Sequence, residues 1–229
     1  MNSESPDRER HLRTRILVWL TLYAIAMAYV EAALVVHLRQ LYYADNLLTI
    51  FPLRLLSHTD LVIELVREAA TILMLVTVAF LAERGNGRRF AAFVYIFGVW
   101  DLGYYSCLKL LIDWPQTWLE WDVLFLLPWP WFGPWITPAA IALLFTGWGA
   151  WVLLSEHQPR ISWLSASLFV GGAVLGLTAF LLPAADLLPR GEVAFQGYQP
   201  EHFAWSLFML GFVAMTAGLI FALRNKKKE

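Results

Sequence analysis

The chain contains 229 residues, of which 59% are hydrophobic and 15% are charged, and its formal net charge at pH 7 is -1. Soluble domains average about 45–50% apolar and about 25% charged residues, so this composition excludes the disordered, collagen-like and ordinary globular classes. The near-neutral charge gives no reason to expect a nucleic-acid partner. The single cysteine, Cys107, excludes a disulfide scaffold. The composition predicts an all-α, polytopic integral membrane protein whose main partner is the lipid bilayer.

Six apolar segments are long enough to cross a bilayer. A spanning helix needs about 20 mostly apolar residues, because each residue rises about 1.5 Å and the hydrocarbon core is about 30 Å thick. The segments that qualify are 16–38, 61–82, 90–112, 138–155, 163–182 and 203–223. They define a membrane domain over residues 16–223, between an N-terminal tail (1–15) and a basic C-terminal tail (224–229).

The positions of Lys and Arg predict the orientation of these spans. Twelve of them flank the spans on the side of the two chain termini, whereas the other side has three, Arg39, Arg54 and Arg190. Basic loops stay in the cytoplasm, so both termini are expected there, with the plasma (inner) membrane as the location. An alternative is a signal peptide cleaved after Ala26-Met27-Ala28. The apolar stretch continues to Leu38, however, and is longer than the apolar region of a signal peptide.

The outer segment 113–135, before the fourth span, is unusually rich in aromatic residues and proline. It holds six of the twelve tryptophans and four prolines. This proline density is incompatible with a regular helix, and irregular backbone exposed to lipid is not tolerated. The favoured interpretation is an interfacial aromatic belt at the lipid headgroups. The alternative is a re-entrant segment that covers a site beneath it. Glu120 and Asp122, beside tryptophans, are expected to face water.

Ionisable residues inside the predicted spans are costly and mark candidate functional sites. Glu31 lies seven residues before the outer end of the first span, and Glu68 lies seven residues after the outer start of the second. Both are therefore about 10 Å deep at 1.5 Å per residue. Asp101 and Tyr105 share one face of the third span through their i,i+4 spacing. Three helices thus place polar groups at a similar depth, which predicts a shared outward-facing pocket.

The second span carries a polar stripe, because Glu64, Glu68 and Thr71 lie on one face. Arg67 can pair with one of these glutamates, and Lys109 can extend toward the interface. The four carboxylates, Glu31, Glu64, Glu68 and Asp101, then exceed the cations by two or three. In a region of low dielectric constant, such a surplus requires protons on the carboxyl groups or a bound cation. A simpler alternative is an ion-pair network that only holds the helices together.

Histidines near the outer ends of the spans raise the question of a metal. His37 and His202 could join Glu31 or Glu68 in a site of mixed nitrogen and oxygen ligands. The chain has neither an HExxH motif nor a Glu-x-x-His pair of the di-iron type. No cofactor is evident from the sequence, and a metal ion remains only an alternative occupant of the pocket.

The leading hypothesis is a small membrane protein that binds or translocates a proton, a metal ion or a cationic solute. The binding groups are the four carboxylates named above, with Arg67, Tyr105, Thr71 and Lys109 in supporting roles. One alternative is a membrane-embedded enzyme that acts on a lipid or lipid-linked substrate at the outer interface. Another is an accessory subunit of a membrane complex. Either a second copy of the chain or a different membrane protein is an expected partner.

Overall fold

The computed structural model describes residues 6–54, 56–127, 129–156, 158–185 and 187–224. Within these ranges, six helices are long and apolar enough to cross a membrane. The prediction of an all-α polytopic membrane protein is therefore confirmed. The helices are α1 (Pro6–Tyr42), α2 (His58–Ala82), α3 (Asn86–Ile112), α4 (Ile136–Leu154), α5 (Trp163–Leu181) and α6 (Trp205–Arg224). Residues 225–229, which make up most of the predicted basic tail, lie outside the described residues.

The first helix is longer than the apolar pattern predicts. It begins at Pro6 rather than at residue 16, and it continues to Tyr42. Its 37 residues extend about 55 Å at 1.5 Å per residue, well beyond the thickness of a hydrocarbon core. In its first turns, Arg13 and Glu9 form an ion pair of 3.0 Å at i,i+4 spacing, which favours helix outside the apolar span.

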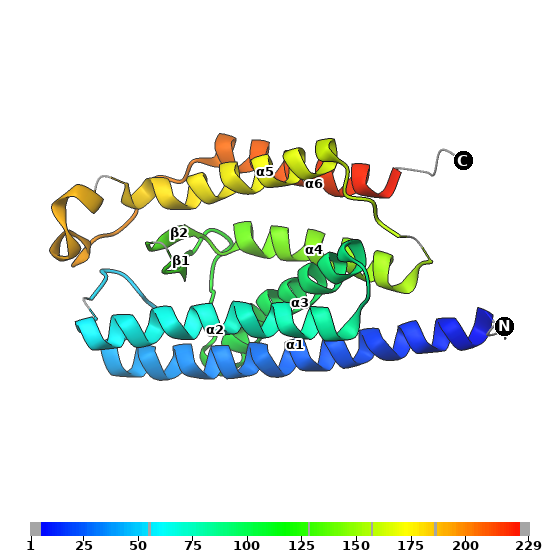
Figure 1. The fold of residues 1–229 in the computed structure, drawn as a ribbon. Coiled ribbons are helices and arrows are strands. Elements are labelled where there is room, and N and C mark those ends of the chain that lie inside the picture. The colour runs from blue at the N-terminus through cyan, green and yellow to red at the C-terminus, as the bar shows by residue number, and fades with distance from the viewer. Residues whose placement is uncertain (1–5, 55, 128, 157, 186, 225–229) are drawn as a thin grey trace.

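The helices are arranged in layers (Figure 1). Helix α3 contacts α1, α2 and α4, and α5 packs along α6 as a separate pair. Both chain termini lie at one end of the bundle, which we call the termini end. The opposite end, which we call the hairpin end, carries a small antiparallel sheet and the turns between α5 and α6. Those turns are the 3-10 helices η1 (Leu182–Ala184), η2 (Leu188–Arg190) and η3 (Glu192–Phe195).

Glycines allow the closest contacts between helices. A Cβ atom on Gly98 of α3 would lie 2.5 Å from the carbonyl oxygen of Ala142 on α4. A Cβ atom on Gly172 of α5 would likewise lie 2.5 Å from the carbonyl oxygen of Gly211 on α6. Without side chains at these positions the backbones approach closely, which is a common way of packing helices in membranes.

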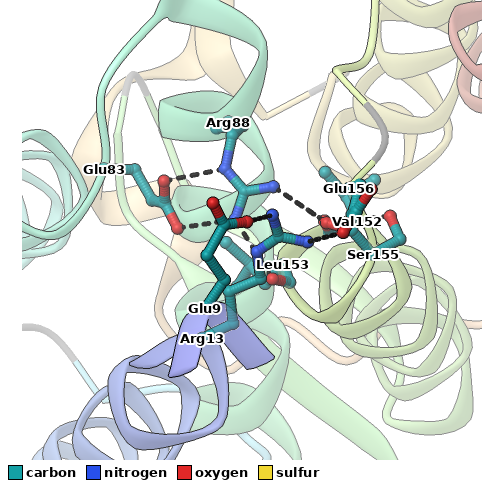
Figure 2. A network of polar contacts seen from close by, with 8 residues as sticks. All are labelled: Glu9, Arg13, Glu83, Arg88, Val152, Leu153, Ser155 and Glu156. Carbon is teal, nitrogen blue, oxygen red and sulfur yellow. Dashed lines mark hydrogen bonds and ion pairs between the residues drawn. The ribbon is translucent and has the colours of Figure 1, made fainter. Parts of the chain in front are cut away.

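At the termini end, Arg88 ties the start of α3 to the end of α4 (Figure 2). Its guanidinium group donates to both carboxylate oxygens of Glu83, at 2.8 and 2.9 Å. It also donates to the carbonyl oxygens of Val152, Leu153 and Ser155, at 3.1 to 3.2 Å. The last carbonyls of a helix have no backbone partner within the helix, and this buried arginine supplies donors to them. We call this arrangement the Arg88 clamp.

The Trp- and Pro-rich segment forms a hairpin at the opposite end of the bundle. Strand β1 (Trp121–Phe125) pairs antiparallel with β2 (Trp131–Pro134), with an irregularity between Val123 and Phe125. The prediction that this segment is not a regular helix is consistent with the structure, but the pair of strands was not predicted. A Cβ atom on Gly133 would lie 2.8 Å from the ring of Phe180 on α5, so this glycine lets the hairpin pack against the bundle.

Candidate functional site

A cavity of about 900 Å³ lies beneath the hairpin and reaches side chains of all six described helices. Toward α1, α2 and α3 its wall carries charged and hydroxyl groups, and we call this part the charged end. Toward α4, α5 and α6 its wall is almost entirely apolar, and we call this part the apolar end. A cavity of this size matches the volumes of small-molecule binding sites, which are about 300–1,000 Å³.

At the charged end, Arg67 is held by two glutamates. Its Nη1 donates to Glu31 of α1 at 2.6 Å, and its Nε and Nη2 donate to both oxygens of Glu64, at 3.0 and 2.5 Å. These contacts join α1 to α2. They form an ion-pair network between helices in which Glu64, and not Glu68, is the second partner of Arg67. The remaining carboxylates of the cavity form no ion pair with Arg67 among the described residues.

Glu68 lies one turn further along α2, is only 3% exposed, and binds the hairpin. Both of its carboxylate oxygens accept from the backbone N–H of Leu126, at 2.9 and 3.0 Å. Leu126 directly follows β1, so the carboxylate positions the turn of the hairpin over the cavity. Glu68 thus lines the cavity and also binds the hairpin that covers it.

Asp122 of β1 is a member of the site that the sequence reasoning missed. It was expected to face water, but it is 3% exposed and lines the cavity. Its Oδ2 accepts from the hydroxyl of Tyr105 at 3.1 Å, and its Oδ1 accepts from the N–H of Val123 at 3.0 Å. Burial raises the pKa of Asp122 to about 6, while the positive charge of Arg39 and the bond from Tyr105 act in the opposite direction. Glu120, by contrast, is partly exposed and caps a turn by accepting from the N–H groups of Gln116 and Thr117.

Arg39, in the last turn of α1, was counted only as a loop cation in the sequence. In the structure it is 3% exposed and lines the cavity. The signal that would have found it is helical periodicity, because Glu31, Val35 and Arg39 follow i,i+4,i+8 spacing and all three line the cavity. The predicted first span ended one residue before Arg39, and this boundary hid the relationship.

Asp101 and Tyr104 of α3 complete the charged end. One oxygen of Asp101, Oδ2, is buried and has no hydrogen-bond partner among the described residues. Tyr104 lines the same cavity as Arg39, Asp101 and Asp122, so groups from α1, α3 and the hairpin share this wall.

Among the described lining residues, carboxylates outnumber guanidinium groups by five to three. The carboxylates belong to Glu31, Glu64, Glu68, Asp101 and Asp122, and the guanidinium groups to Arg39, Arg54 and Arg67. The lining therefore has more acids than bases, as in the predicted set, although Arg39, Arg54 and Asp122 were not part of that set.

Four other predicted residues lie outside this cavity. The hydroxyl of Thr71 donates to the carbonyl oxygen of Arg67 on its own helix. Lys109 is exposed, pairs with Asp113 at 2.6 Å, and lines a separate cavity of about 470 Å³. His37 and His202 are exposed. Within the described part of the chain, no group of three or more His, Cys, Asp or Glu side chains could hold a metal ion.

The apolar end is lined by aromatic and aliphatic side chains. They include Phe97 and Trp100 of α3, Phe145 of α4, Phe169 and Phe180 of α5, and Met215 of α6. Val170 and Val174 of α5 also line the cavity, yet they are 57% and 55% exposed. The wall along α5 is therefore open to the surface of the bundle that faces acyl chains when the protein spans a membrane.

The fold and the cavity define a multi-pass helical membrane protein with a large pocket beneath the hairpin. Comparisons with protein-family models, with curated proteins and with solved structures found no match for this chain.

Proposed function

We propose that this membrane protein binds an amphiphilic molecule, with a cationic part of its polar group at the charged end and its apolar part along α5. The observation that carries this proposal is the continuity of one cavity from the carboxylates of α2 and α3 to the aromatic side chains of α4 and α5. Binding sites match their ligands in polarity, so a cavity that is charged at one end and apolar at the other favours a molecule with both properties.

The acid surplus supports a positive charge in the polar group. Arg67 is already engaged by Glu31 and Glu64, whereas Asp101 has a buried oxygen without a described partner. An unpartnered carboxylate oxygen in a region of low dielectric constant is stabilised by a donor or a cation. An ammonium group beside Asp101 would supply both.

The exposed lining residues Val170 and Val174 support entry from the bilayer rather than from water. The Arg88 clamp lies at the other end of α3 and α4 and links them tightly there. If the basic termini are cytoplasmic, as the distribution of Lys and Arg suggests, the pocket serves the outer leaflet of the plasma membrane. The lipid substrate of the enzyme hypothesis and the cationic solute of the transport hypothesis both require this binding step.

Native mass spectrometry of the protein in a neutral detergent tests the proposal. The probes are a diacyl lipid with a trimethylammonium headgroup and the diacylglycerol with the same chains. We expect the cationic lipid to bind saturably and at least tenfold more tightly than the diacylglycerol. Asp101→Asn should reduce this preference, whereas Asp113→Asn, at an exposed position beyond the end of α3, should not.

A second pair of variants tests the apolar end. Ala173→Phe places a ring in the cavity and should weaken the binding of both lipids at least tenfold. Gly171→Phe adds the same ring on the same helix, at a position with nothing within 4 Å of an added Cβ atom, and should leave binding unchanged. The proposal is wrong if neither lipid binds saturably, or if Ala173→Phe binds both as the unmodified chain does.

The same acid surplus favours a second candidate, in which the pocket binds a proton or a small cation for transport. Glu68→Gln keeps an oxygen to accept from Leu126 and removes one ionisable group, so it should preserve the fold. Reconstituted vesicles loaded with a pH-sensitive dye would show cation-driven proton movement that this variant abolishes. Vesicles without such movement would leave no support for this candidate.

A further inference from the structure

Four side chains in the cavity wall carry buried polar atoms without a hydrogen-bond partner among the described residues: the indole N–H groups of Trp100 and Trp129, and two charged side chains, one acidic and one basic. The acid Asp101 has been described above. The base is Arg39, whose Nε and Nη2 have no hydrogen-bond partner among the residues that the structure describes. The other buried charged groups at this end have partners, since Arg67 pairs with two glutamates, Glu68 accepts from Leu126, and Asp122 accepts from Tyr105.

The surroundings of Arg39 satisfy only part of its guanidinium group. The central carbon of the group lies over the ring of Trp114, 4.2 Å from the ring centroid, as in a cation–π contact. Its Nη1 donates to the carbonyl oxygen of Leu47 at 3.3 Å. No ion pair joins Arg39 to a carboxylate in the described ranges, and its Nε and Nη2 remain unsatisfied there.

An arginine buried without a counter-ion is expensive, and its planar fork of donors matches carboxylate and phosphate oxygens. Asp101 calls for the complementary group, a donor with positive charge. Both side chains lie in the wall of the same cavity.

We propose that the polar group of the ligand is zwitterionic, with a phosphate held by Arg39 and an ammonium group held by Asp101. This inference rests on the proposed function and narrows it to amine-bearing phospholipids of the phosphatidylethanolamine type. Such a headgroup satisfies both of the unpartnered charged side chains at once. A purely cationic lipid leaves Arg39 unpaired, and a purely anionic lipid leaves Asp101 unpaired.

The first test compares headgroups on the unmodified protein, by native mass spectrometry with equal acyl chains. Phosphatidylethanolamine should bind at least tenfold more tightly than phosphatidylglycerol and than the trimethylammonium lipid. The inference is overturned if either of the singly charged lipids binds as tightly as phosphatidylethanolamine. Soluble phosphoethanolamine is included to separate a lipid from its free headgroup. It should not compete at millimolar concentration, and competition there would instead overturn the amphiphile proposal.

The second test uses two variants that are expected to change the binding of different lipids. Arg39→Gln should weaken the binding of phosphatidylethanolamine at least tenfold. The binding of the trimethylammonium lipid should stay the same or become tighter. Asp101→Asn should weaken the binding of both of these lipids and leave the binding of phosphatidylglycerol unchanged. Arg190→Gln is the matched control, because Arg190 is an exposed arginine at the same end of the bundle. Equal weakening of all lipids by Arg39→Gln would mean a structural role and would overturn the inference.

The outcomes separate this inference from the proposed function. If the trimethylammonium lipid binds saturably and Ala173→Phe blocks it, the amphiphile proposal stands, whatever Arg39 does. If Arg39→Gln does not fold, the headgroup order of the unmodified chain still decides whether an anion site exists.

Discussion

The hydroxyl group of Tyr105, on α3, donates a hydrogen bond of 3.1 Å to the carboxylate of Asp122, on β1. Both side chains are buried, at 5% and 3% exposure, and they lie 17 residues apart in the chain. This contact joins the central helix of the bundle to the hairpin that covers the cavity. Together with the contact between Glu68 and Leu126, it attaches the hairpin to two helices.

The titration of Asp122 should make stability depend on pH. Its pKa is raised by burial from an ordinary 3.8 to about 6, so the folded chain binds more protons than the unfolded chain between these values. The stabilisation is therefore greatest below about pH 4 and is lost as the pH rises through 6, by about 3 kcal/mol at 1.36 kcal/mol per pKa unit.

Melting temperatures of the purified protein between pH 4 and 7 would measure this effect. Asp122→Asn keeps an acceptor for Tyr105 but does not titrate, so the unmodified chain should lose stability relative to this variant as the pH rises. A constant difference between the two across this range would contradict the prediction.

The anchor between α2 and the hairpin should be visible in amide exchange. Glu68→Ala removes the acceptor for the N–H of Leu126, and an unsatisfied buried donor costs about 1–3 kcal/mol. We expect faster hydrogen exchange at Leu126 and its neighbours in β1. The control is Glu120→Ala, which should speed exchange at Gln116 and Thr117 but not at Leu126. Unchanged exchange at Leu126 in Glu68→Ala would show that the hairpin is held by other contacts.

The Arg88 clamp should contribute strongly to stability. Arg88→Met leaves Glu83 without its ion-pair partner and removes a donor from the carbonyl oxygens of Val152, Leu153 and Ser155 at the end of α4. Removal of one member of a buried ion pair destabilises proteins by about 3–5 kcal/mol. The melting temperature should therefore fall steeply. Arg84→Met, at an exposed position four residues earlier, should change it little. Equal changes of melting temperature in the two variants would contradict a stabilising role of the Arg88 clamp.

The contact between α3 and α4 depends on Gly149. A Cβ atom at this position would lie 2.7 Å from Cβ of Tyr95 and 2.8 Å from the carbonyl oxygen of Ala91. Gly149→Ala should therefore destabilise the fold by about 1–3 kcal/mol, the usual range for overpacking. Gly147→Ala, on the same helix with nothing within 4 Å, should be neutral or stabilising by up to about 1 kcal/mol. Thermal unfolding of both variants in one detergent gives the comparison.

The helical architecture could be read from the sequence because hydrophobic length is a strong signal. The predicted and observed ends of the second span agree at residue 82, and those of the third agree at residue 112. Depth counting placed Glu31, Glu68 and Tyr105 at one level, with Asp101 one turn deeper, and all four line the same cavity. Such counting is possible because each residue of a helix advances by a fixed distance.

Arg39 and Asp122 could not be found by the same reasoning. Arg39 lies beyond the apolar run that defined the first span, although its helix continues to Tyr42. Asp122 is buried by a strand whose pairing with β2 depends on contacts between distant residues, and strand preferences depend heavily on such context. The rule that acidic residues beside tryptophans face water failed there, because the hairpin turns Asp122 toward Tyr105.

The open wall along α5 determines how access to the pocket would be controlled. A molecule that enters past Val170 and Val174 arrives by diffusion within one leaflet, and its supply depends on its mole fraction among the lipids rather than on any aqueous concentration. Detergent in excess would dilute such a molecule even at constant molarity. The lipids that surround the protein would then be the source of the molecules that occupy the pocket.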